Sequence, residues 1–233
     1  MNPIGEPAPG VPPPVTLLAP VTSAEEFAAA FSVSRETAGR IETYVALLKS
    51  WQKSINLISP GTVREIWHRH IADSAQLFAL APESSRYWID LGSGGGLPGI
   101  VLAILLAERP GARMTLVESD ARKAAFLREA ARVTSAPVDI MCTRIERAAT
   151  HVRIDEVDVI TARALAPLGR LLGYCRPLFG PRTVALLPKG RDVESEIAAA
   201  RRSWAFDARL VASRTEADAR IVVIRELHEL AGG

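Results

Sequence analysis

The chain has 233 residues, 48% of them hydrophobic, and a formal net charge of only +2, which excludes a polybasic coat for nucleic acid. Its two cysteines, Cys142 and Cys175, form no C-x-x-C pattern, so we expect a reducing compartment, no disulfide framework and no metal site. No apolar run reaches the roughly 18 residues of a membrane span, and the start of the chain lacks a signal-peptide pattern. These features predict a cytoplasmic protein that does not contact membranes.

The first part of the chain is predicted to be helical after a leader. Residues 1–20 contain seven prolines and are expected to be disordered. Capping patterns then start three helices, the second with apolar side chains at helical spacing from Ile41 to Ile55 and the third with a bend near His70. The capping residues are Ser23, Ser34 and Thr62. Residues 21–82 are therefore expected to form a helical cap on the domain that follows.

From residue 83 onward, apolar strands alternate with helices. Strands are predicted at 86–91, 113–118, 137–142, 156–161, 182–187, 205–212 and 219–226, and helices at about 98–107, 120–132, 145–150, 167–176 and 191–203. This alternation indicates a parallel sheet with helices on both faces, and the last two strands, with no helix between them, predict an antiparallel hairpin. We expect an α/β fold over residues 83–233: a doubly wound, mostly parallel, Rossmann-like seven-stranded sheet with an antiparallel last strand.

One stretch organises this domain: residues 87–99, Y-W-I-D-L-G-S-G-G-G-L-P-G. A buried strand ends near Asp90, four glycines follow within five positions, and Pro98 suits the first turn of a helix. Strand, glycine turn and helix in this order are typical of a nucleotide-type ligand site at the carboxyl end of a sheet.

The charge of this turn indicates its ligand. Leu97 stands where the dinucleotide pattern G-x-G-x-x-G needs its third glycine, which disfavours an NAD-dependent oxidoreductase. Asp90 would repel a pyrophosphate but attract the ammonium and sulfonium groups of S-adenosylmethionine (AdoMet). Glu118 stands 24 residues beyond Gly94, as a ribose-binding acid would. The alternative is a glycine turn that binds nothing.

Arg163 follows the fourth predicted strand, beside the expected ligand crevice. No N-P-P-Y-like cluster for methylation of an amine stands there, and neither cysteine is placed to act as a thiolate nucleophile. An arginine without a base suits an acceptor atom that already has a free lone pair, such as guanine N7, because such an atom needs only alignment. A structural ion pair is the alternative for Arg163.

Three further polar residues have two interpretations each. His70 and Asp73 lie three residues apart and share a helical face, so they either bond to each other and hold the cap on the sheet, or face a substrate. Lys189, after the fifth strand, is either a contact for an RNA phosphate or a solvated loop lysine. The His70 segment has too few ligands for a metal ion.

Four motifs together resemble one known family. They are D-L-G-S-G-G-G-L-P-G, R-H-I-A-D-S, N-L-I after the long helix and A-R-A after the fourth strand, all within about residues 35–228. They resemble the RsmG (GidB) family of AdoMet-dependent methyltransferases of bacterial small-subunit rRNA. The resemblance implies the class I methyltransferase fold, AdoMet as cofactor, and methylation at N7 of the guanine at position 527, in the 530 loop of 16S rRNA.

The resemblance also implies roles for individual residues. It adds Gly92, Leu97, Ile145, Glu146 and Arg163 to Asp90 and Gly94 as cofactor contacts, and it makes Glu118 the ribose ligand. The residues expected to face RNA are Asn56, His70, Asp73 and Lys189. Pro188, before Lys189, and Ala72 depart from the residues usual in the family, and the Pro-rich leader has no counterpart there.

The predicted enzyme is thus a 16S rRNA guanine-N7 methyltransferase in which Arg163 positions the reactants and no general base is needed. Its partner is the rRNA of the small ribosomal subunit or of a precursor particle, and we expect a monomer. Two alternatives stay open: a methyltransferase of another RNA, a protein or a small molecule, and a non-enzymatic nucleotide-binding regulator of cell division.

Overall fold

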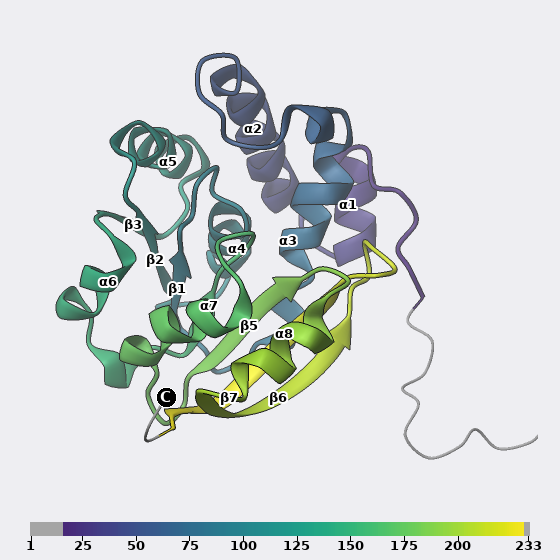
Figure 1. The fold of residues 1–233 in the computed structure, drawn as a ribbon. Coiled ribbons are helices and arrows are strands. Elements are labelled where there is room, and N and C mark those ends of the chain that lie inside the picture. The colour runs from purple at the N-terminus through teal and green to yellow at the C-terminus, as the bar shows by residue number, and fades with distance from the viewer. Residues whose placement is uncertain (1–15, 231–233) are drawn as a thin grey trace, which may run out of the picture.

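This computed structural model describes residues 16–230 of the chain. They form one seven-stranded sheet with helices packed against it (Figure 1). The strands lie in the order β3-β2-β1-β4-β5-β7-β6. Their bounds are β1 (Tyr87–Leu91), β2 (Arg113–Glu118), β3 (Val138–Cys142), β4 (Val159–Thr161), β5 (Val184–Lys189), β6 (Trp204–Ala212) and β7 (Arg220–Glu229). Strands β1 to β5 are parallel, and β7 runs antiparallel to both β5 and β6. The predicted mostly parallel sheet with an antiparallel last strand is confirmed.

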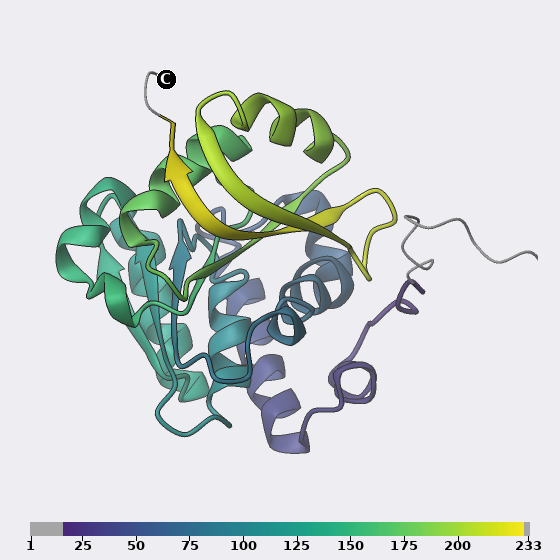
Figure 2. The ribbon, with the colours of Figure 1, turned by 90° about the horizontal axis from the view of Figure 1, so that it is seen from below.

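Helices cover both faces of this sheet (Figure 2). They are α1 (Ala24–Phe31), α2 (Arg35–Trp51), α3 (Asp73–Ala75), α4 (Gly99–Leu106), α5 (Ala121–Thr134), α6 (Ile145–Ala148), α7 (Leu168–Cys175) and α8 (Val193–Ala200). Trp88 belongs to the core beneath α1 to α5, whereas the next residue, Ile89, belongs to the core beneath α6, α7 and α8. Successive side chains of a strand point to opposite faces, so the uninterrupted apolar runs of the sequence supply two cores.

The helical cap differs in detail from its prediction. Helix α2 ends at Trp51, not near Ile55. The single bent helix predicted after Thr62 is instead a 3-10 helix, η1 (Pro60–Glu65), a π-helix, η2 (Trp67–Ala72), the short α3 and a second 3-10 turn, η3 (Phe78–Leu80). The segment around His70, where a bend was predicted, is this π-helix.

Two segments bordering the sheet are shorter than predicted. β4 begins at Val159, and the carboxylate of Asp158 before it accepts from the backbone amides of Arg86 and Tyr87. The 3-10 turn η5 (Ile154–Glu156) occupies the start of the predicted strand. The helix expected over 145–150 is α6 followed by the 3-10 turn η4 (Ala149–His151), and η6 (Arg176–Leu178) extends α7.

The described end of the chain before α1 packs on the rest of the protein. The backbone amide of Leu18 donates to the carbonyl of Arg214, 2.7 Å away, and that of Val21 donates to Nδ1 of His68. The first 15 residues of the predicted leader lie outside the described residues. Among residues 16–230, no helix is long and apolar enough to cross a membrane.

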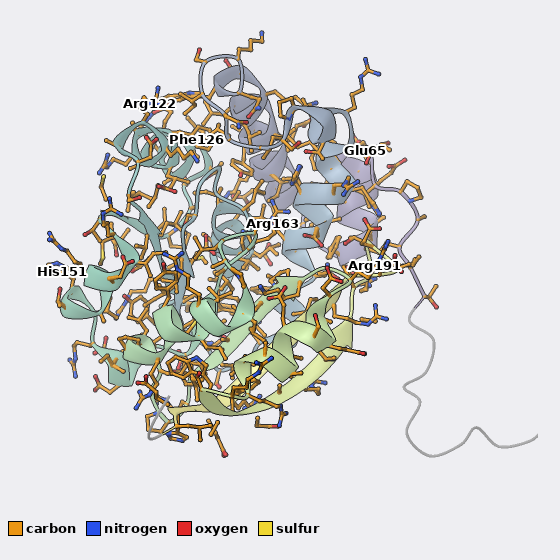
Figure 3. The ribbon with its side chains drawn as sticks, viewed as in Figure 1. Glu65, Arg122, Phe126, His151, Arg163 and Arg191 are labelled. Atoms are coloured by element: carbon orange, nitrogen blue, oxygen red, sulfur yellow. The ribbon has the colours of Figure 1, made fainter. Side chains whose placement is uncertain are left out.

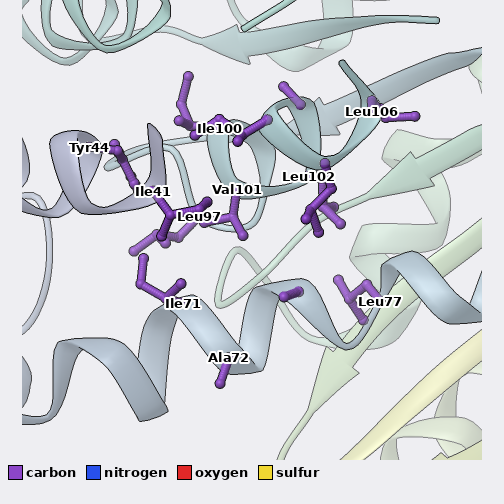
Figure 4. Close-up of a cluster of buried hydrophobic side chains, with 14 of the residues drawn as sticks. Ile41, Tyr44, Ile71, Ala72, Leu77, Leu97, Ile100, Val101, Leu102 and Leu106 are labelled. Atoms are coloured by element: carbon purple, nitrogen blue, oxygen red, sulfur yellow. The ribbon is translucent and has the colours of Figure 1, made fainter. Parts of the chain in front are cut away.

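Helix α4 joins the cap to the sheet. Every residue from Gly99 to Leu106 is buried, because the sheet lies on one side of the helix and the cap on the other. Figure 4 shows α2 and the π-helix η2 placing apolar side chains such as Ile41 and Ile71 around the start of α4. The cap therefore packs directly beside the glycine-rich turn that precedes α4.

Candidate functional site

The glycine-rich turn lies between β1 and α4 at the carboxyl edge of the sheet. Gly92, Gly94 and Gly96 have φ angles of +67°, +53° and +82°, which glycine adopts without steric cost. A Cβ atom placed on Gly92 would lie 2.7 Å from a methyl group of Leu165, so a side chain covers that position. A Cβ atom on Gly94 would meet nothing closer than the carbonyl oxygen of Gly92, at 3.8 Å. The backbone at Gly94 thus presents an open face to a ligand.

Glu118, at the end of β2, is bound to this turn. One carboxylate oxygen accepts from the backbone amide of Gly94 at 2.9 Å, and the other accepts from the amide of Asp120 at 2.7 Å. The side chain is buried, so two backbone amides fix its orientation. Each oxygen retains a lone pair that can accept from a hydroxyl group.

Asp90 lies beneath the turn and is only 1% exposed. Its Oδ1 accepts from the hydroxyl of Thr161 at 2.7 Å, and its Oδ2 is buried without a partner among the described residues. Burial raises the pKa of Asp90 to about 6, although hydrogen bonds from Ser93 and Thr161 oppose the rise. A Cβ atom on Gly99 would lie 2.7 Å from Oδ2, so the carboxylate packs against the first residue of α4.

Other predicted site residues are spread around the turn. Leu97 is buried in the core that joins α4 to the cap, so its side chain points inward. Ile145 and Glu146 begin α6, the first half-buried and the second exposed. Asn56 is exposed after α2 and lies 3.4 Å from the amide nitrogen of Gln52.

Arg163 connects the end of β4 to the π-helix of the cap. Its Nη2 lies 3.0 Å from Nδ1 of His70, and its Nη1 lies 3.4 Å from both Oδ2 of Asp73 and the carbonyl oxygen of Arg69. The side chains of Arg163 and Asp73 are only 19% and 18% exposed. The ion pair considered as the alternative for Arg163 is therefore present. His70 and Asp73 do not bond to each other as the sequence suggested; each contacts Arg163.

Both ring nitrogens of His70 are engaged. Nδ1 faces Arg163, and Nε2 lies 2.7 Å from the hydroxyl of Thr62. A guanidinium only donates, so Nδ1 is the acceptor and Nε2 carries the proton. Burial, with the nearby charges of Arg163 and Arg69, lowers the pKa of His70 to about 4. The imidazole is therefore neutral at physiological pH and does not titrate near pH 6.5.

A cavity of about 350 Å³ lies on the cap side of Arg163. It brings together four of the predicted residues, His70, Asp73, Arg163 and Lys189, with parts of η1 and of the β6–β7 turn. Asn56 is not among its lining residues. Figure 3 shows Arg163 near the middle of the molecule, whereas Arg191 lies toward one edge of the view.

Lys189 is the last residue of β5, and its ammonium is held. Nζ donates to Oε2 of Glu196 at 2.8 Å and to the carbonyl of Ala166 at 2.7 Å. The side chain is only 10% exposed, so the alternative of a solvated loop lysine is wrong.

Three features of the cavity had no separate signal in the sequence. Thr62 was identified only as a capping residue, yet its hydroxyl binds His70. Thr215, in the β6–β7 turn, donates to Oδ1 of Asp73 at 2.8 Å. Ala164 has a φ of +51°, a conformation that is uncommon outside glycine, directly after Arg163. The first two contacts join segments distant in sequence, so only the fold could reveal them.

Comparison with known proteins identifies the family. Residues 38–223 match the family described as rRNA small subunit methyltransferase G. The chain belongs to this family. A relative from Parvibaculum lavamentivorans named Ribosomal RNA small subunit methyltransferase G is 53% identical over 208 residues, covering 89% of this chain and 91% of the relative. A relative of the same name from Methylorubrum extorquens is 50% identical over 195 residues, covering 84% of this chain and 91% of the relative.

Solved structures share the fold at low sequence identity. A protein from Corynebacterium glutamicum aligns with a TM-score of 0.55 at 15% identity, covering 80% of this chain and 91% of that chain. A cofactor-bound protein from MTB, Rv0187, aligns with a TM-score of 0.55 at 14% identity, covering 80% of this chain and 89% of that chain. With the family membership, these structures confirm the predicted class I methyltransferase fold.

Membership in this family also confirms the predicted enzyme class, an rRNA methyltransferase, and its cofactor, AdoMet. The site residues fit this molecule in three respects. The backbone of Gly94 leaves open space, Glu118 offers two fixed acceptor oxygens suited to ribose hydroxyls, and Asp90 provides negative charge beneath the turn. The chemistry of the donor and acceptor groups thus suits a cationic nucleoside.

Replacing Glu118 by alanine is expected to weaken AdoMet binding about tenfold to a hundredfold, because hydrogen bonds to a charged group each contribute about 1.5–3 kcal/mol. The amides of Gly94 and Asp120 would also lose their acceptor, which loosens the turn. Calorimetric titration measures the affinity, and Glu129→Ala, which removes a partly exposed carboxylate paired with Arg132, is the control. A change of less than twofold in Glu118→Ala would exclude Glu118 as the ribose ligand.

The neutral, buried His70 predicts a specific loss of stability in acid. Its folded-state pKa of about 4 lies below the ordinary value of 6.5, so the unfolded chain binds more protons between these values. The contribution is complete above about pH 6.5 and is lost as the pH falls toward 4, by up to about 3 kcal/mol. Denaturant unfolding at pH 7 and pH 4.5 should show a larger loss in wild type than in His70→Gln. The titration of Asp90 affects both proteins equally and cancels in the comparison. Equal losses of unfolding free energy in the two proteins would therefore contradict the lowered pKa of His70.

Proposed function

We propose that this chain methylates N7 of the guanine at position 527 in the 530 loop of bacterial 16S rRNA, using AdoMet. The substrate is the small ribosomal subunit or its precursor, and the reaction takes place in the cytoplasm, where these particles assemble. Two named relatives at about half identity support the rRNA substrate. The chemistry of the cavity beside Arg163 supports the acceptor atom.

The observation that carries the choice of N7 is that both bases in contact with Arg163, His70 and Asp73, are already engaged by other groups. His70 has one ring nitrogen on Arg163 and the other on Thr62. Asp73 accepts from Arg163, Thr215 and Gln76. N7 of guanine carries an in-plane lone pair and no proton, so its reaction requires alignment and not deprotonation.

In this proposal Arg163 holds the guanine, the cofactor or both at the reacting geometry. Its guanidinium is fixed from three directions, by His70, Asp73 and the carbonyl of Arg69, so little freedom is lost when the reactants bind. AdoMet, when bound, supplies a methyl group on a sulfonium centre that a nitrogen lone pair can displace. The chain itself contributes position and charge.

The remaining predicted contacts complete the proposal. Gly92, Gly94, Leu97, Glu118 and the start of α6 (Ile145 and Glu146) surround the cofactor, with Asp90 acting through its charge from beneath. Asn56, His70, Asp73 and Lys189 belong to the RNA side. Because Lys189 is already paired with Glu196, its contribution to RNA binding would require that pair to open.

Mass mapping of small-subunit rRNA tests the proposal. Purified wild-type protein and AdoMet carrying a labelled methyl group are added to small subunits, to naked 16S rRNA and to subunits from cells lacking the protein. We expect one N7-methylguanine in the 530 loop, formed fully only where the site is unmodified. Label on another nucleotide, on ribosomal protein or on a small molecule would overturn the assignment. AdoMet binding without any transfer would favour a non-enzymatic regulator.

A further inference from the structure

The helical cap contacts the glycine-rich turn through a tyrosine. Tyr44 of α2 has no exposed surface, and its hydroxyl donates to the carbonyl oxygen of Gly95. The same hydroxyl would lie 3.1 Å from a Cβ atom on Gly96. Burial raises the pKa of Tyr44, so the hydroxyl remains protonated and acts as a donor at every physiological pH. The ring of Tyr44 packs near the ring of Phe126 in α5, with 6.4 Å between the ring centroids, so this contact helps to fix the orientation of the tyrosine side chain.

A second contact reaches the same glycine from the segment after α2. The carbonyl oxygen of Leu57 would lie only 2.9 Å from a Cβ atom on Gly95, so the two backbones are in close contact. The side chain of Gln52 holds this segment: its Oε1 accepts from the amides of Leu57 and Ile58, and its Nε2 donates to the carbonyl of Ile58 at 2.8 Å. The cap thus contacts Gly95 at two points.

Both contacts are made at Gly95, the residue directly after the open Gly94. They add to the bonds that the turn makes itself, from the amides of Gly96 and Leu97 to the carbonyl of Ser93. Glycines have many accessible conformations, so a run of them holds one binding-competent shape only where the surroundings impose it. Tyr44 and Gln52 supply such surroundings from a part of the chain that precedes the sheet.

We propose that Tyr44 is a positioning residue for the cofactor, with Gln52 as its second support, so that the cap prepares the turn for AdoMet binding. The inference rests on the proposed cofactor contacts at this turn. If the turn adopts the competent shape only part of the time, the apparent dissociation constant rises in inverse proportion to that fraction. Both residues act through the backbone of the turn: Tyr44 bonds to Gly95, and Gln52 holds Leu57 against it.

The test compares Tyr44→Phe with Tyr87→Phe. Each variant removes one hydroxyl from a buried tyrosine, but Tyr87 bonds to Thr115 in the sheet, far from the turn in the fold. We expect Tyr44→Phe to raise the KM for AdoMet about threefold to tenfold, the equivalent of one net hydrogen bond, with kcat and the KM for small subunits unchanged. Tyr87→Phe should leave all three values unchanged, whatever its effect on melting temperature.

Amide hydrogen exchange gives a readout that general destabilisation would not imitate. In free Tyr44→Phe, the amides of Gly96 and Leu97 should exchange faster than in wild type, while those of β1 remain protected. Saturating AdoMet should restore wild-type protection, because binding imposes the competent shape. Unchanged exchange at these two amides, or equal KM values in wild type and Tyr44→Phe, would overturn the inference.

Gln52→Met keeps the inference testable if Tyr44→Phe does not fold. Gln52 is half-buried and methionine keeps its length, so the variant removes the three backbone contacts with little change in packing. The same rise in the KM for AdoMet is expected, and an unchanged value would refute the role of the cap. The proposed function fails separately, if wild-type protein transfers no methyl group to rRNA.

Discussion

Valine in place of Gly94 is expected to abolish AdoMet binding while the protein stays folded. The backbone there has a φ of +53°. A Cβ atom added at Gly94 would have only one atom outside its chain neighbours within 4 Å, the carbonyl oxygen of Gly92 at 3.8 Å. The Cβ atom of valine therefore meets no clash in the free protein, although the left-handed backbone costs about 1–2 kcal/mol for a residue with a Cβ atom. The open space is the surface that we assign to the cofactor, so affinity should fall more than about a hundredfold.

Gly111→Val separates backbone strain from blocked binding. Gly111 has a φ of +74° and lies in the turn before β2, where a Cβ atom would meet no other atom within 4 Å. Both variants should lose a similar amount of unfolding free energy, but only Gly94→Val should lose AdoMet binding in calorimetric titration. Normal affinity in folded Gly94→Val would show that the cofactor does not approach this glycine.

Lysine in place of Arg163 is expected to lower the rate of methyl transfer about a hundredfold, because a misplacement of about 1 Å costs this much in an alignment-dependent reaction. Arg163 directs its planar fork to His70, Asp73 and a backbone carbonyl together. Lysine keeps the charge but offers a single ammonium on a flexible stem, so it cannot hold all three partners. Arg191→Lys, which alters an exposed ion pair with Asp218, is the control and should retain the wild-type rate.

The pH dependence of that rate separates alignment from base catalysis. With AdoMet saturating, single-turnover transfer should be nearly flat between about pH 6.5 and 9, because guanine N7 has no proton to lose. The pKa of His70 near 4 places its titration below this window, so the shallow step that an ordinary histidine would add is not expected. Arg163→Lys should lower the rate by a similar factor at every pH. A tenfold rise across the window in both wild type and His70→Gln would show that a base is required.

Much of the glycine-rich turn and its surroundings could be predicted because the signals are local. The apolar run before Asp90, the glycines and the apolar helix after them stand within 20 consecutive residues. Each restricts the backbone over a short range: burial selects the strand, glycine permits positive φ, and the next apolar run continues as a helix. The acid at the end of the next strand follows from sheet geometry, since parallel strands bring their carboxyl ends to one edge. Glu118 indeed binds Gly94.

The arrangement of the residues around Arg163 was decided by tertiary structure. Arg163 and His70 are 93 residues apart, and Asp73 and Thr215 are 142 apart, so no local pattern could show that they are bonded. The sequence offered an interaction between His70 and Asp73 because they are three residues apart. The π-helix and the approach of Arg163 replace it, since a buried guanidinium requires several acceptors at once.

By itself, then, the sequence determined the fold class, the family and the glycine-rich turn of this protein, because each depends on a contiguous pattern or on the alternation of strands and helices. Only the tertiary structure decided that β7 inserts between β5 and β6, that Lys189 pairs with Glu196, and that Tyr44 bonds to the carbonyl of Gly95. These depend on which surfaces meet after the chain folds, and the free energy of such contacts comes from burial and from matching donors with acceptors across elements distant in sequence.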